Sequence, residues 1–219
     1  MNNNFNKFLL AKESFIYIVC LLLIGICLYV IVPVLAVIPL FFLLFIFYFF
    51  RNPPRKITKR ENMIISPADG KIMYITEIDD DRFIFGRAYK ISIFLSVFNV
   101  HINRAPISGI VKYIDYRPGK FLPAFKSHAS EINERNTVGI ENENIKIMVN
   151  QLTGFLARRI VCFVKEGDLL NKGDRYGLIE FGSCTEIIIP VDKVYLRVKP
   201  GEKVRGGKSI IGVSHEDEC

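Results

Sequence analysis

The sequence predicts a mainly β protein in which a compact β-sandwich body follows an N-terminal transmembrane helical hairpin. Three observations lead to this fold class. One uncharged apolar run, residues 15–50, lies near the start of the chain. From residue 61 onward, short runs of β-branched and aromatic residues alternate with turns that contain glycine or proline. Helix-period patterns of useful length are scarce outside the apolar run.

The apolar run is expected to form a membrane-anchoring helical hairpin within residues 1–50. As one straight helix the run would be about 54 Å long, whereas the hydrocarbon core of a bilayer is about 30 Å thick. We therefore predict two spans, about residues 15–32 and 34–50, with a turn near Pro33. A single kinked or partly interfacial segment is the alternative. A secretory signal peptide is disfavoured because the apolar stretch is too long for one.

Basic residues flank the apolar run on both sides and predict its orientation. Lys7 and Lys12 precede it, and residues 51–60 follow as a basic linker around Pro53 and Pro54. Because positive residues prefer the cytoplasmic side, the body is expected on the cytoplasmic face of the cell membrane. With a membrane hairpin in the same chain, the net charge of +7 favours anionic lipid as a partner. Nucleic acid is not expected, since no binding motif for it appears.

Residues 61–219 are expected to form the β domain. The strand-like runs are, in order, 64–65, 71–75, 82–85, 90–95, 110–113, 137–140, 145–151, 157–164, 175–180 and 186–189. The segment 118–136 between them is polar and irregular. The five cysteines include no C-x-x-C pair and are odd in number, so the sequence predicts neither a disulfide framework nor a metal site.

One internal repeat predicts how the β domain is built. Residues 164–168 lead through Gly173 into 176–179, and residues 198–202 lead through Gly207 into 209–213. Each segment reads as strand, glycine turn, strand, glycine turn, strand. The pattern resembles the β-sandwich of biotinyl and lipoyl carrier domains. We therefore expect a body of two interlocked lipoyl/biotinyl-like halves.

The residues that suggest chemistry begin with Gly182 and Ser183. A serine after a glycine, with a short tail behind it, can attack the preceding carbonyl if a base removes its proton. Asp69 and His101 would supply an orienting carboxylate and an imidazole base. Taken alone, Phe-Gly-Ser at 181–183 is more often an ordinary turn.

Several longer motifs carry a family resemblance from residue 51 to about residue 212. They are RNP at 51–53, SPADGKI at 66–72, IFLSVFNVHINRAPISG at 93–109, PGKF at 118–121, ASEINERN at 129–136, ARRIVCFVKEGD at 157–168 and FGS at 181–183. In this order the motifs resemble the short, bacterial and archaeal form of the phosphatidylserine decarboxylases. None of them is decisive alone, but jointly they are specific.

The resemblance implies an enzyme made from a self-cleaving precursor. Cleavage between Gly182 and Ser183 would give a β chain, 1–182, and an α chain, 183–219, which stay together as a heterodimer. A higher oligomer of this heterodimer is the open alternative. Residue 183 would become a pyruvoyl group that forms a Schiff base with membrane phosphatidylserine, yielding phosphatidylethanolamine and CO₂. No metal and no PLP would be required.

The resemblance also implies roles for the surrounding residues. His101 and Asp69 would be catalytic, and Arg104, Asn103 and Asn99 are expected to bind substrate. Arg104 stands where longer members carry a second histidine, so one imidazole has to serve both self-cleavage and decarboxylation, or Arg104 acts electrostatically. Cys184 stands where the family often carries arginine, and this departure puts any role of that arginine in doubt.

Two other readings of the chain remain open from the sequence. A pyruvoyl decarboxylase for a soluble amino acid is one, and the membrane run argues against it. A non-catalytic, membrane-anchored lipoyl-like adaptor of a transport complex is the other. Such adaptors usually have long helical hairpins, and none is visible in the sequence after residue 61. An enzyme would run as two bands on a denaturing gel, whereas an adaptor would run as one.

Overall fold

The computed structural model describes residues 9–122, 132–154, 159–180 and 183–215. The chain forms two compact units, Met1–Pro54 and Arg55–Cys219. The first is helical and the second is a β body, so the expectation of a mainly β chain with an apolar helical N-terminus is confirmed.

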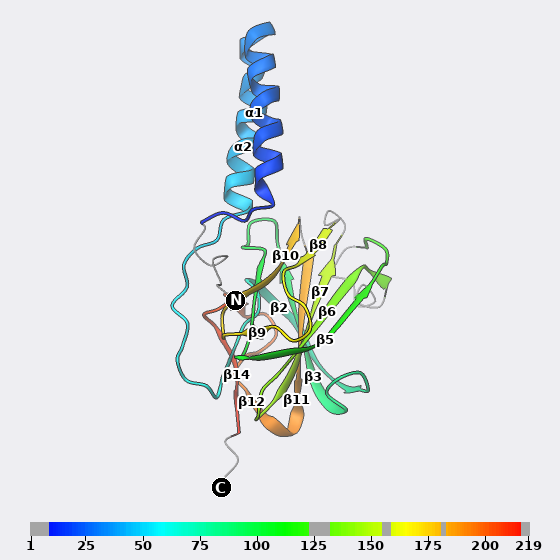
Figure 1. The fold of residues 1–219 in the computed structure, drawn as a ribbon. Helices are drawn as coiled ribbons and strands as arrows, with labels where there is room; N and C mark the ends of the chain where they lie inside the picture. Colours follow the sequence, from blue (N-terminus) through cyan, green and yellow to red (C-terminus); the bar gives the residue numbers. More distant parts are fainter. Residues whose placement is uncertain (1–8, 123–131, 155–158, 181–182, 216–219) are drawn as a thin grey trace. The chain divides into compact units, whose positions relative to one another are not determined.

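The N-terminal unit is a pair of helices. Helix α1 (Ser14–Ile31) is followed by the 3₁₀ turn η2 (Pro33–Ala36) and by α2 (Val37–Phe49), and the two α-helices lie side by side (Figure 1). The break falls at Val32 and Pro33, where the sequence predicts it. Proline has no N–H to continue a helix, but it fits the first position of a new one.

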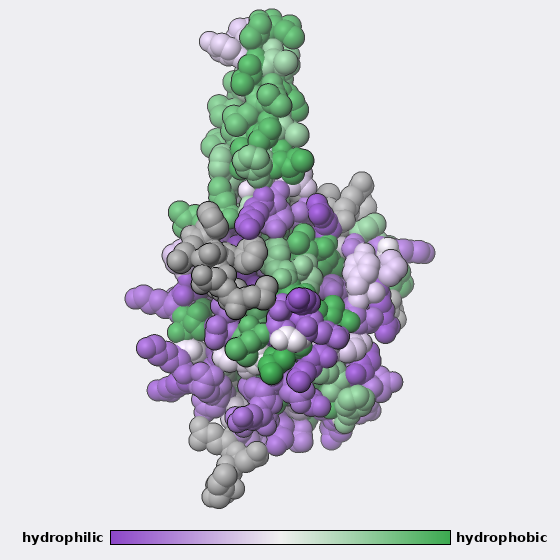
Figure 2. All heavy atoms as spheres, viewed as in Figure 1, coloured by the Kyte–Doolittle hydropathy of each residue, from purple (hydrophilic) through white to green (hydrophobic). Residues whose placement is uncertain are grey.

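The helices differ in length. Ser14–Ile31 is long and apolar enough to cross a membrane, whereas the 13 residues of α2 extend only about 20 Å at 1.5 Å per residue. Large apolar side chains on both helices are exposed, including Leu23 at 62% and Phe41 at 66%, and apolar residues cover the surface of the pair (Figure 2). Exposed apolar surface of this extent marks an interaction site, so it supports membrane association.

The β body is made of short and medium strands. They are β1 (Met63–Ile65), β2 (Gly70–Asp80), β3 (Gly86–Leu95), β4 (Ile102–Arg104), β5 (Gly109–Arg117), β6 (Arg135–Glu141), β7 (Lys146–Thr153), β8 (Arg159–Cys162), β9 (Leu169–Leu170), β10 (Arg175–Glu180), β11 (Ser183–Pro190), β12 (Val194–Leu196), β13 (Lys203–Val204) and β14 (Ile210–Ser214), with a 3₁₀ turn η3 at Val191–Lys193.

The strands form one large and two small sheets. The large sheet has the order β13-β2-β3-β11-β7-β6-β5-β9, and the small ones have the orders β1-β14-β12 and β4-β10-β8. Every strand pair in them is antiparallel. A core of isoleucine, valine and leucine side chains, among them Ile93, Val149 and Ile187, is buried within the body. Strand β11 lies inside the large sheet, with β3 on one side and β7 on the other.

One expected strand is wrong. Residues 82–85 form the turn between β2 and β3 instead. The Asp80 carboxylate accepts the N–H groups of Phe83 at 3.0 Å and Ile84 at 2.9 Å, and Phe85 has a φ of 58°. A carboxylate that accepts local backbone donors stabilises a turn over a strand, despite the apolar side chains in the segment.

The sequence repeat has a counterpart in the hydrogen bonds. The Gly167 N–H donates to the Val111 carbonyl and the Gly201 N–H to the Ile72 carbonyl, both at 2.8 Å. Both glycines have a φ of 90°, a conformation that side chains with a Cβ rarely adopt. The two segments therefore turn in the same way against corresponding strands, β5 and β2.

The second glycine of each segment matches as well. The Gly173 N–H donates to the Ala105 carbonyl at 2.8 Å, and the Gly207 N–H donates to the Ser66 carbonyl at 2.9 Å. A Cβ placed on either glycine would lie close to the Ile57 side chain, at 2.5 Å for Gly173 and 3.1 Å for Gly207. The two turns thus converge on one residue of the segment that precedes β1.

Candidate active site

The expected nucleophile lies at the start of β11. The backbone of Ser183 pairs with Leu95 of β3 and with Thr153 of β7. Gly182, the other side of the expected cleavage site, lies outside the described residues. The peptide bond in question therefore immediately precedes an internal strand of the large sheet.

His101 is held close to this strand end by the backbone. Its carbonyl accepts the N–H of Ile179 at 3.2 Å, near the end of β10. Leu95, six residues before His101, pairs with Ser183. The turn 96–101 is therefore fastened at both ends to the stretch 179–183. This topology brings His101 and Ser183, two of the predicted residues, to the same region.

The contact of the His101 ring fixes its tautomer. Nδ1 lies 3.0 Å from the main-chain oxygen of Asn99. A carbonyl oxygen only accepts, so Nδ1 carries the proton and Nε2 of the neutral ring is the basic nitrogen. The imidazole itself is fully buried. A histidine in this state is suited to act as a general base through Nε2.

Asn99 forms the turn that carries His101. Its Oδ1 accepts the N–H of Ser96 at 2.9 Å and the hydroxyl of Ser96 at 2.8 Å. Its own N–H donates to the Ser96 carbonyl at 2.9 Å. These bonds define the local chain direction. The side chain is thus engaged within the turn, and its expected contact with substrate stays a prediction.

Asn103 belongs to a buried chain of polar side chains beneath the strand end. Its Nδ2 donates to Thr185 Oγ1 at 3.0 Å, and its Oδ1 accepts from Gln151 Nε2 at 2.9 Å. Gln151 Oε1 in turn accepts from Asn136 Nδ2 at 2.8 Å. We refer to Asn136, Gln151, Asn103 and Thr185 as the amide chain. It connects β6, β7, β4 and β11, and it reaches β11 two residues after Ser183.

A second polar cluster lies around Glu186, the next residue of β11. Glu186 Oε1 accepts from Ser92 Oγ at 3.2 Å and Oε2 accepts from Asn150 Nδ2 at 3.0 Å, and the side chain is 1% exposed. Sequence reasoning missed Gln151, Thr185, Asn150 and Glu186. The signal was present, because polar pairs interrupt the apolar strands in residues 147–152 and 184–189.

Cys184 is buried against Leu152. Burial raises the pKa of its thiol well above the ordinary value, and the nearby charge of Glu186 acts in the same direction. The thiol is therefore protonated at neutral pH and is a poor nucleophile. Its position next to Ser183 does not make it a competing reactive group.

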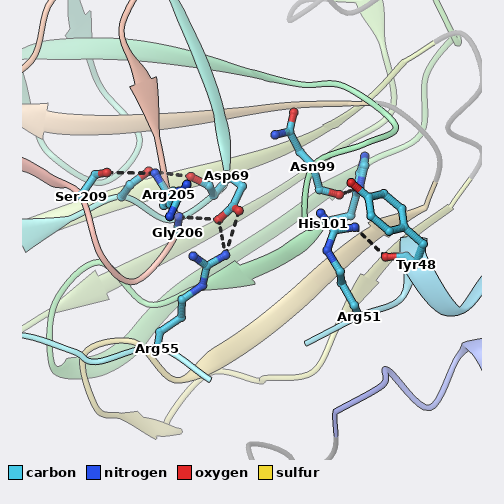
Figure 3. A network of polar contacts seen from close by, with 11 residues as sticks. Tyr48, Arg51, Arg55, Asp69, Asn99, His101, Arg205, Gly206 and Ser209 are labelled. Atoms are coloured by element: carbon cyan, nitrogen blue, oxygen red, sulfur yellow. Dashed lines mark hydrogen bonds and ion pairs between the residues drawn. The ribbon is translucent and has the colours of Figure 1, made fainter. Parts of the chain in front are cut away.

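The Asp69 carboxylate contacts a different set of groups from His101. It accepts Arg55 Nη2 at 2.8 and 3.1 Å, and the Gly206 N–H at 2.7 Å. In Figure 3 the carboxylate is directed at Arg55 and Gly206, whereas the His101 ring lies beside Asn99. The role of Asp69 in orienting the imidazole stays a prediction, and the Arg55 ion pair is a feature that the sequence did not indicate.

Arg104 is buried, with its Nη1 donating to the Gly173 carbonyl at 2.9 Å. Burial, together with the nearby charges of Arg55 and Arg175, lowers the pKa of its guanidinium to about 10. Neighbours on a strand face opposite sides. Arg104 accordingly contacts the Gly173 turn, whereas Asn103 contacts Thr185. The expected substrate contact of Arg104 stays a prediction.

Asn133, within the 129–136 motif, supports the strand on the other side of Ser183. Its Nδ2 donates to the carbonyls of Leu122 at 2.7 Å and Thr153 at 2.8 Å, and its Oδ1 accepts the Leu122 N–H at 2.8 Å. Thr153 is the residue of β7 that pairs with Ser183. Among the described residues, no group of three or more His, Cys, Asp or Glu side chains is arranged to hold a metal ion.

Comparison with known proteins gives one consistent result. Residues 42–212 match the family model described as phosphatidylserine decarboxylase. A protein of Carboxydothermus hydrogenoformans named phosphatidylserine decarboxylase proenzyme is 57% identical over 175 residues, 79% of this chain and 82% of the relative. Proteins of the same name from Symbiobacterium thermophilum and Chlorobium phaeobacteroides are 47% identical over 170 residues and 38% identical over 203 residues. The first of these matches covers 77% of this chain and 79% of the relative, and the second covers 93% and 95%.

Proposed function

The chain belongs to the phosphatidylserine decarboxylase family, and we infer that it is a carboxy-lyase that converts phosphatidylserine to phosphatidylethanolamine and CO₂. The observation that carries this inference is the match over residues 42–212, which includes both the His101 turn and the start of β11. The similarity of up to 57% to proteins named as decarboxylase proenzymes agrees with it. The adaptor alternative is not supported.

The relatives are named proenzymes. We propose that this chain is likewise a precursor, and that it is cleaved between Gly182 and Ser183. His101 Nε2 takes the proton of the Ser183 hydroxyl, and the oxygen attacks the Gly182 carbonyl carbon. The C–N bond of the peptide then breaks, and Gly182 becomes esterified to the side chain of residue 183. The two parts stay joined through this ester, and its elimination gives the β chain 1–182 and the α chain 183–219.

The ester is resolved by elimination. Removal of the α-proton of residue 183 expels the Gly182 carboxylate and leaves a dehydroalanine. Its enamine form converts to an imine, which water hydrolyses with release of ammonia. Residue 183 thereby ends as a pyruvoyl group. Each of these steps needs a group that accepts and returns a proton, and His101 is the proposed one.

The residues around β11 fit such a group. A pyruvoyl at residue 183 supplies a carbonyl that takes up the electron pair released when CO₂ leaves. Asn103 and Thr185 present buried amide and hydroxyl groups two residues along the strand, and His101 would return a proton to the α-carbon. Asn99, Asn103 and Arg104 are proposed to position the substrate, directly or through these contacts, and Asp69 to support the base. Neither a metal ion nor PLP enters the proposal.

The wider architecture belongs to the same proposal. We take the body to consist of two interlocked lipoyl/biotinyl-like halves, which the matched hydrogen bonds at Gly167 and Gly201 support. The apolar helices would hold the enzyme in the cell membrane with the body on the cytoplasmic face, where a diacyl substrate resides. The β and α chains would remain together as a heterodimer.

The test uses the purified full-length protein in detergent with phosphatidylserine labelled at its carboxyl carbon. The parent should run as two chains, release labelled CO₂ in step with phosphatidylethanolamine, and have an α chain without a free amino terminus. Ser183→Ala should remain one inactive chain of 25.1 kDa, and Cys184→Ala, the neighbouring matched control, should still be cut. Normal cleavage of Ser183→Ala would refute the nucleophile, and cut but inactive parent protein would refute the substrate.

A further inference from the structure

A hollow of about 450 Å³ opens beside the strand end that carries Ser183. Its wall includes Lys71 of β2, Phe94 of β3, Ser96 and Asn99 of the His101 turn, and Lys203 of β13 with the following Arg205. Asp69 also lines it, and Figure 3 shows Asp69 and Asn99 near one another with Arg205 on the Asp69 side. We refer to it as the basic hollow. Its size lies within the range of ligand sites.

The three cations of the basic hollow have no carboxylate partner among the residues that the structure describes. Lys71, Lys203 and Arg205 are exposed, and none of them forms an ion pair there. The carboxylate in the wall, Asp69, is already paired with Arg55 at 2.8 Å. The wall therefore carries an excess of positive charge that is available to an anionic ligand.

The internal repeat shows that the fold does not require these charges. Strand β13 pairs with β2 through Lys203 to Lys71 and Val204 to Gly70. Strand β9 pairs with β5 in the same way, through Leu169 to Ile110 and Leu170 to Gly109. The equivalence extends to side chains. The Gly206 N–H donates to the Asp69 carboxylate at 2.7 Å, and the Lys172 N–H donates to Ser108 Oγ at 3.1 Å.

A hollow of about 570 Å³ lies at the equivalent place in the other half. Ile110 and Leu169 stand there in the positions of Lys71 and Lys203, and the wall carries Glu61, Glu141 and Glu143 with Lys112 as its one cation among the described lining residues. The same local fold thus forms with apolar residues and an acidic wall. The lysine pair occurs only in the hollow beside the strand end of Ser183. Because the fold does not need these charges, their presence there indicates an anionic ligand.

The position of the basic hollow relative to residue 183 sets the size of that ligand. Phe94 and Ser96 line the hollow, and Leu95 between them pairs with Ser183. Adjacent strands lie about 4.8 Å apart. In phosphatidylserine the amine is linked to the phosphorus through the α-carbon, the β-carbon and one oxygen. Ser183 and Leu95 share one face of the sheet, whereas Phe94 and Lys71 share the other. A headgroup whose amine reacts at residue 183 would therefore bring its phosphate to the long side chains of this wall around the strand end, past Ser96.

We propose that the basic hollow binds the phosphodiester of the phosphatidylserine headgroup, with Lys71, Lys203 and Arg205 as its cationic ligands. The inference rests on the proposed function at Ser183. Lysine and arginine form charge-assisted hydrogen bonds with phosphate oxygens, which are stronger than bonds between neutral groups. The hydroxyl of Ser96 and the amide of Asn99 provide polar groups at the side of the hollow nearest to His101.

The test compares the parent with the triple variant Lys71→Gln, Lys203→Gln, Arg205→Gln and with Lys112→Gln, a charge loss in the equivalent hollow. Substitution of exposed side chains leaves folding nearly unchanged, so all three proteins should cut themselves to the same extent. With monomeric short-chain phosphatidylserine, KM of the triple variant should rise by about tenfold or more. A tenfold rise corresponds to a loss of about 1.4 kcal/mol in binding free energy. Lys112→Gln should match the parent.

Two further measurements separate the alternatives. If the loss appears only on anionic vesicles and vanishes with monomeric substrate, the cations bind the membrane surface and the proposal is wrong. Calorimetry with glycerophosphoserine and with serine tests the hollow without turnover. The parent should prefer the phosphodiester, and the triple variant should lose that preference. A preference that is retained in a parent that is cut but inactive would refute the proposed function alone. No preference in the parent, or an unchanged preference in the triple variant, would refute the hollow.

Discussion

The carbonyl oxygen of His101 accepts the N–H of Ile179 at 3.2 Å, four residues before Ser183 along the chain. Since Leu95 pairs with Ser183 itself, the turn that carries the imidazole is bound to the chain on both sides of residues 181–182. The base and the peptide bond that it would act on are therefore positioned by backbone hydrogen bonds. Side-chain substitutions nearby can change the chemistry without removing this alignment.

His101→Ala should abolish self-cleavage, because no other described histidine lies beside the turn 96–101. His215→Ala is the matched control. Its ring packs on Tyr195 with a centroid distance of 4.0 Å, so processing should continue at the parent rate. The measurement is a time course of chain cleavage on a denaturing gel. Full processing by His101→Ala would show that another base acts on Ser183.

Asp69→Asn and Arg55→Met distinguish two roles of the Asp69 carboxylate. If Asp69 assists His101, Asp69→Asn should slow cleavage by at least about tenfold, in the direction seen when a triad loses its orienting carboxylate. Arg55→Met, which removes the ion pair alone, should then cleave at nearly the parent rate. Equal slowing in both variants would show that Asp69 acts by anchoring Arg55 and the Gly206 turn, and the Asp69–His101–Ser183 arrangement would have to be given up.

Gln151→Ala should destabilise the body by about 1–3 kcal/mol, since it leaves two buried amide groups without their partner. Those groups are Asn103 Oδ1 and Asn136 Nδ2. Denaturant unfolding of the Ser183→Ala background measures this on one uncut chain. Asn144→Ala, an exposed change, should cost less than about 0.5 kcal/mol. Equal stability of the two variants would contradict a structural role of the amide chain.

Asp80→Asn should make the unfolding free energy less dependent on acid pH. Burial of the Asp80 carboxyl acts to raise its pKa, but the hydrogen bonds from the N–H groups of Ile84 and Phe83 and the charge of Arg82 outweigh this effect. The pKa of Asp80 therefore lies below its ordinary value. A carboxyl whose pKa is lower in the folded than in the unfolded chain stabilises the folded state at pH values above its unfolded pKa. This stabilisation is lost as the pH falls through the folded pKa.

The parent should therefore exceed Asp80→Asn by about 1–2 kcal/mol at pH 7, and the difference should shrink below about pH 4. Asp79→Asn on the exposed side of the same strand is the control, and it should show little difference from the parent at either pH. A gap between parent and Asp80→Asn that stays constant down to pH 3 would contradict the assigned cause.

The sequence predicts features that depend on neighbours along the chain. The helix break at Pro33 and the paired glycine turns at Gly167 and Gly201 are of this kind, because proline and glycine act locally. The turn after Asp80 was not predicted although its cause is local. The apolar run 82–85 has the composition of a strand, and this signal outweighed the ability of Asp80 to accept backbone N–H groups in a turn.

Long-range contacts at the site were not predictable in the same way. The amide chain joins Asn103 to Gln151, 48 positions apart, and to Thr185, 82 positions apart. Polar pairs within apolar strands indicated that such residues needed buried partners, but not which ones. The Arg55 partner of Asp69 likewise comes from the segment expected to be only a linker. The residues at the proposed reaction were found through motifs, and their supporting contacts only through the fold.

The position of β11 has a consequence for what happens if the chain is cut at its first residue. The fragment 183–219 supplies an internal strand and β13 to the large sheet, and β12 and β14 to the sheet with β1. Because these strands remain paired after the cut, the fragment 183–219 dissociates only when the body unfolds. Reassembly of the separated pieces would then be a second-order reaction that slows on dilution. The precursor can fold alone at any concentration, whereas the mature protein, once unfolded, has lost the covalent link that made its first folding unimolecular.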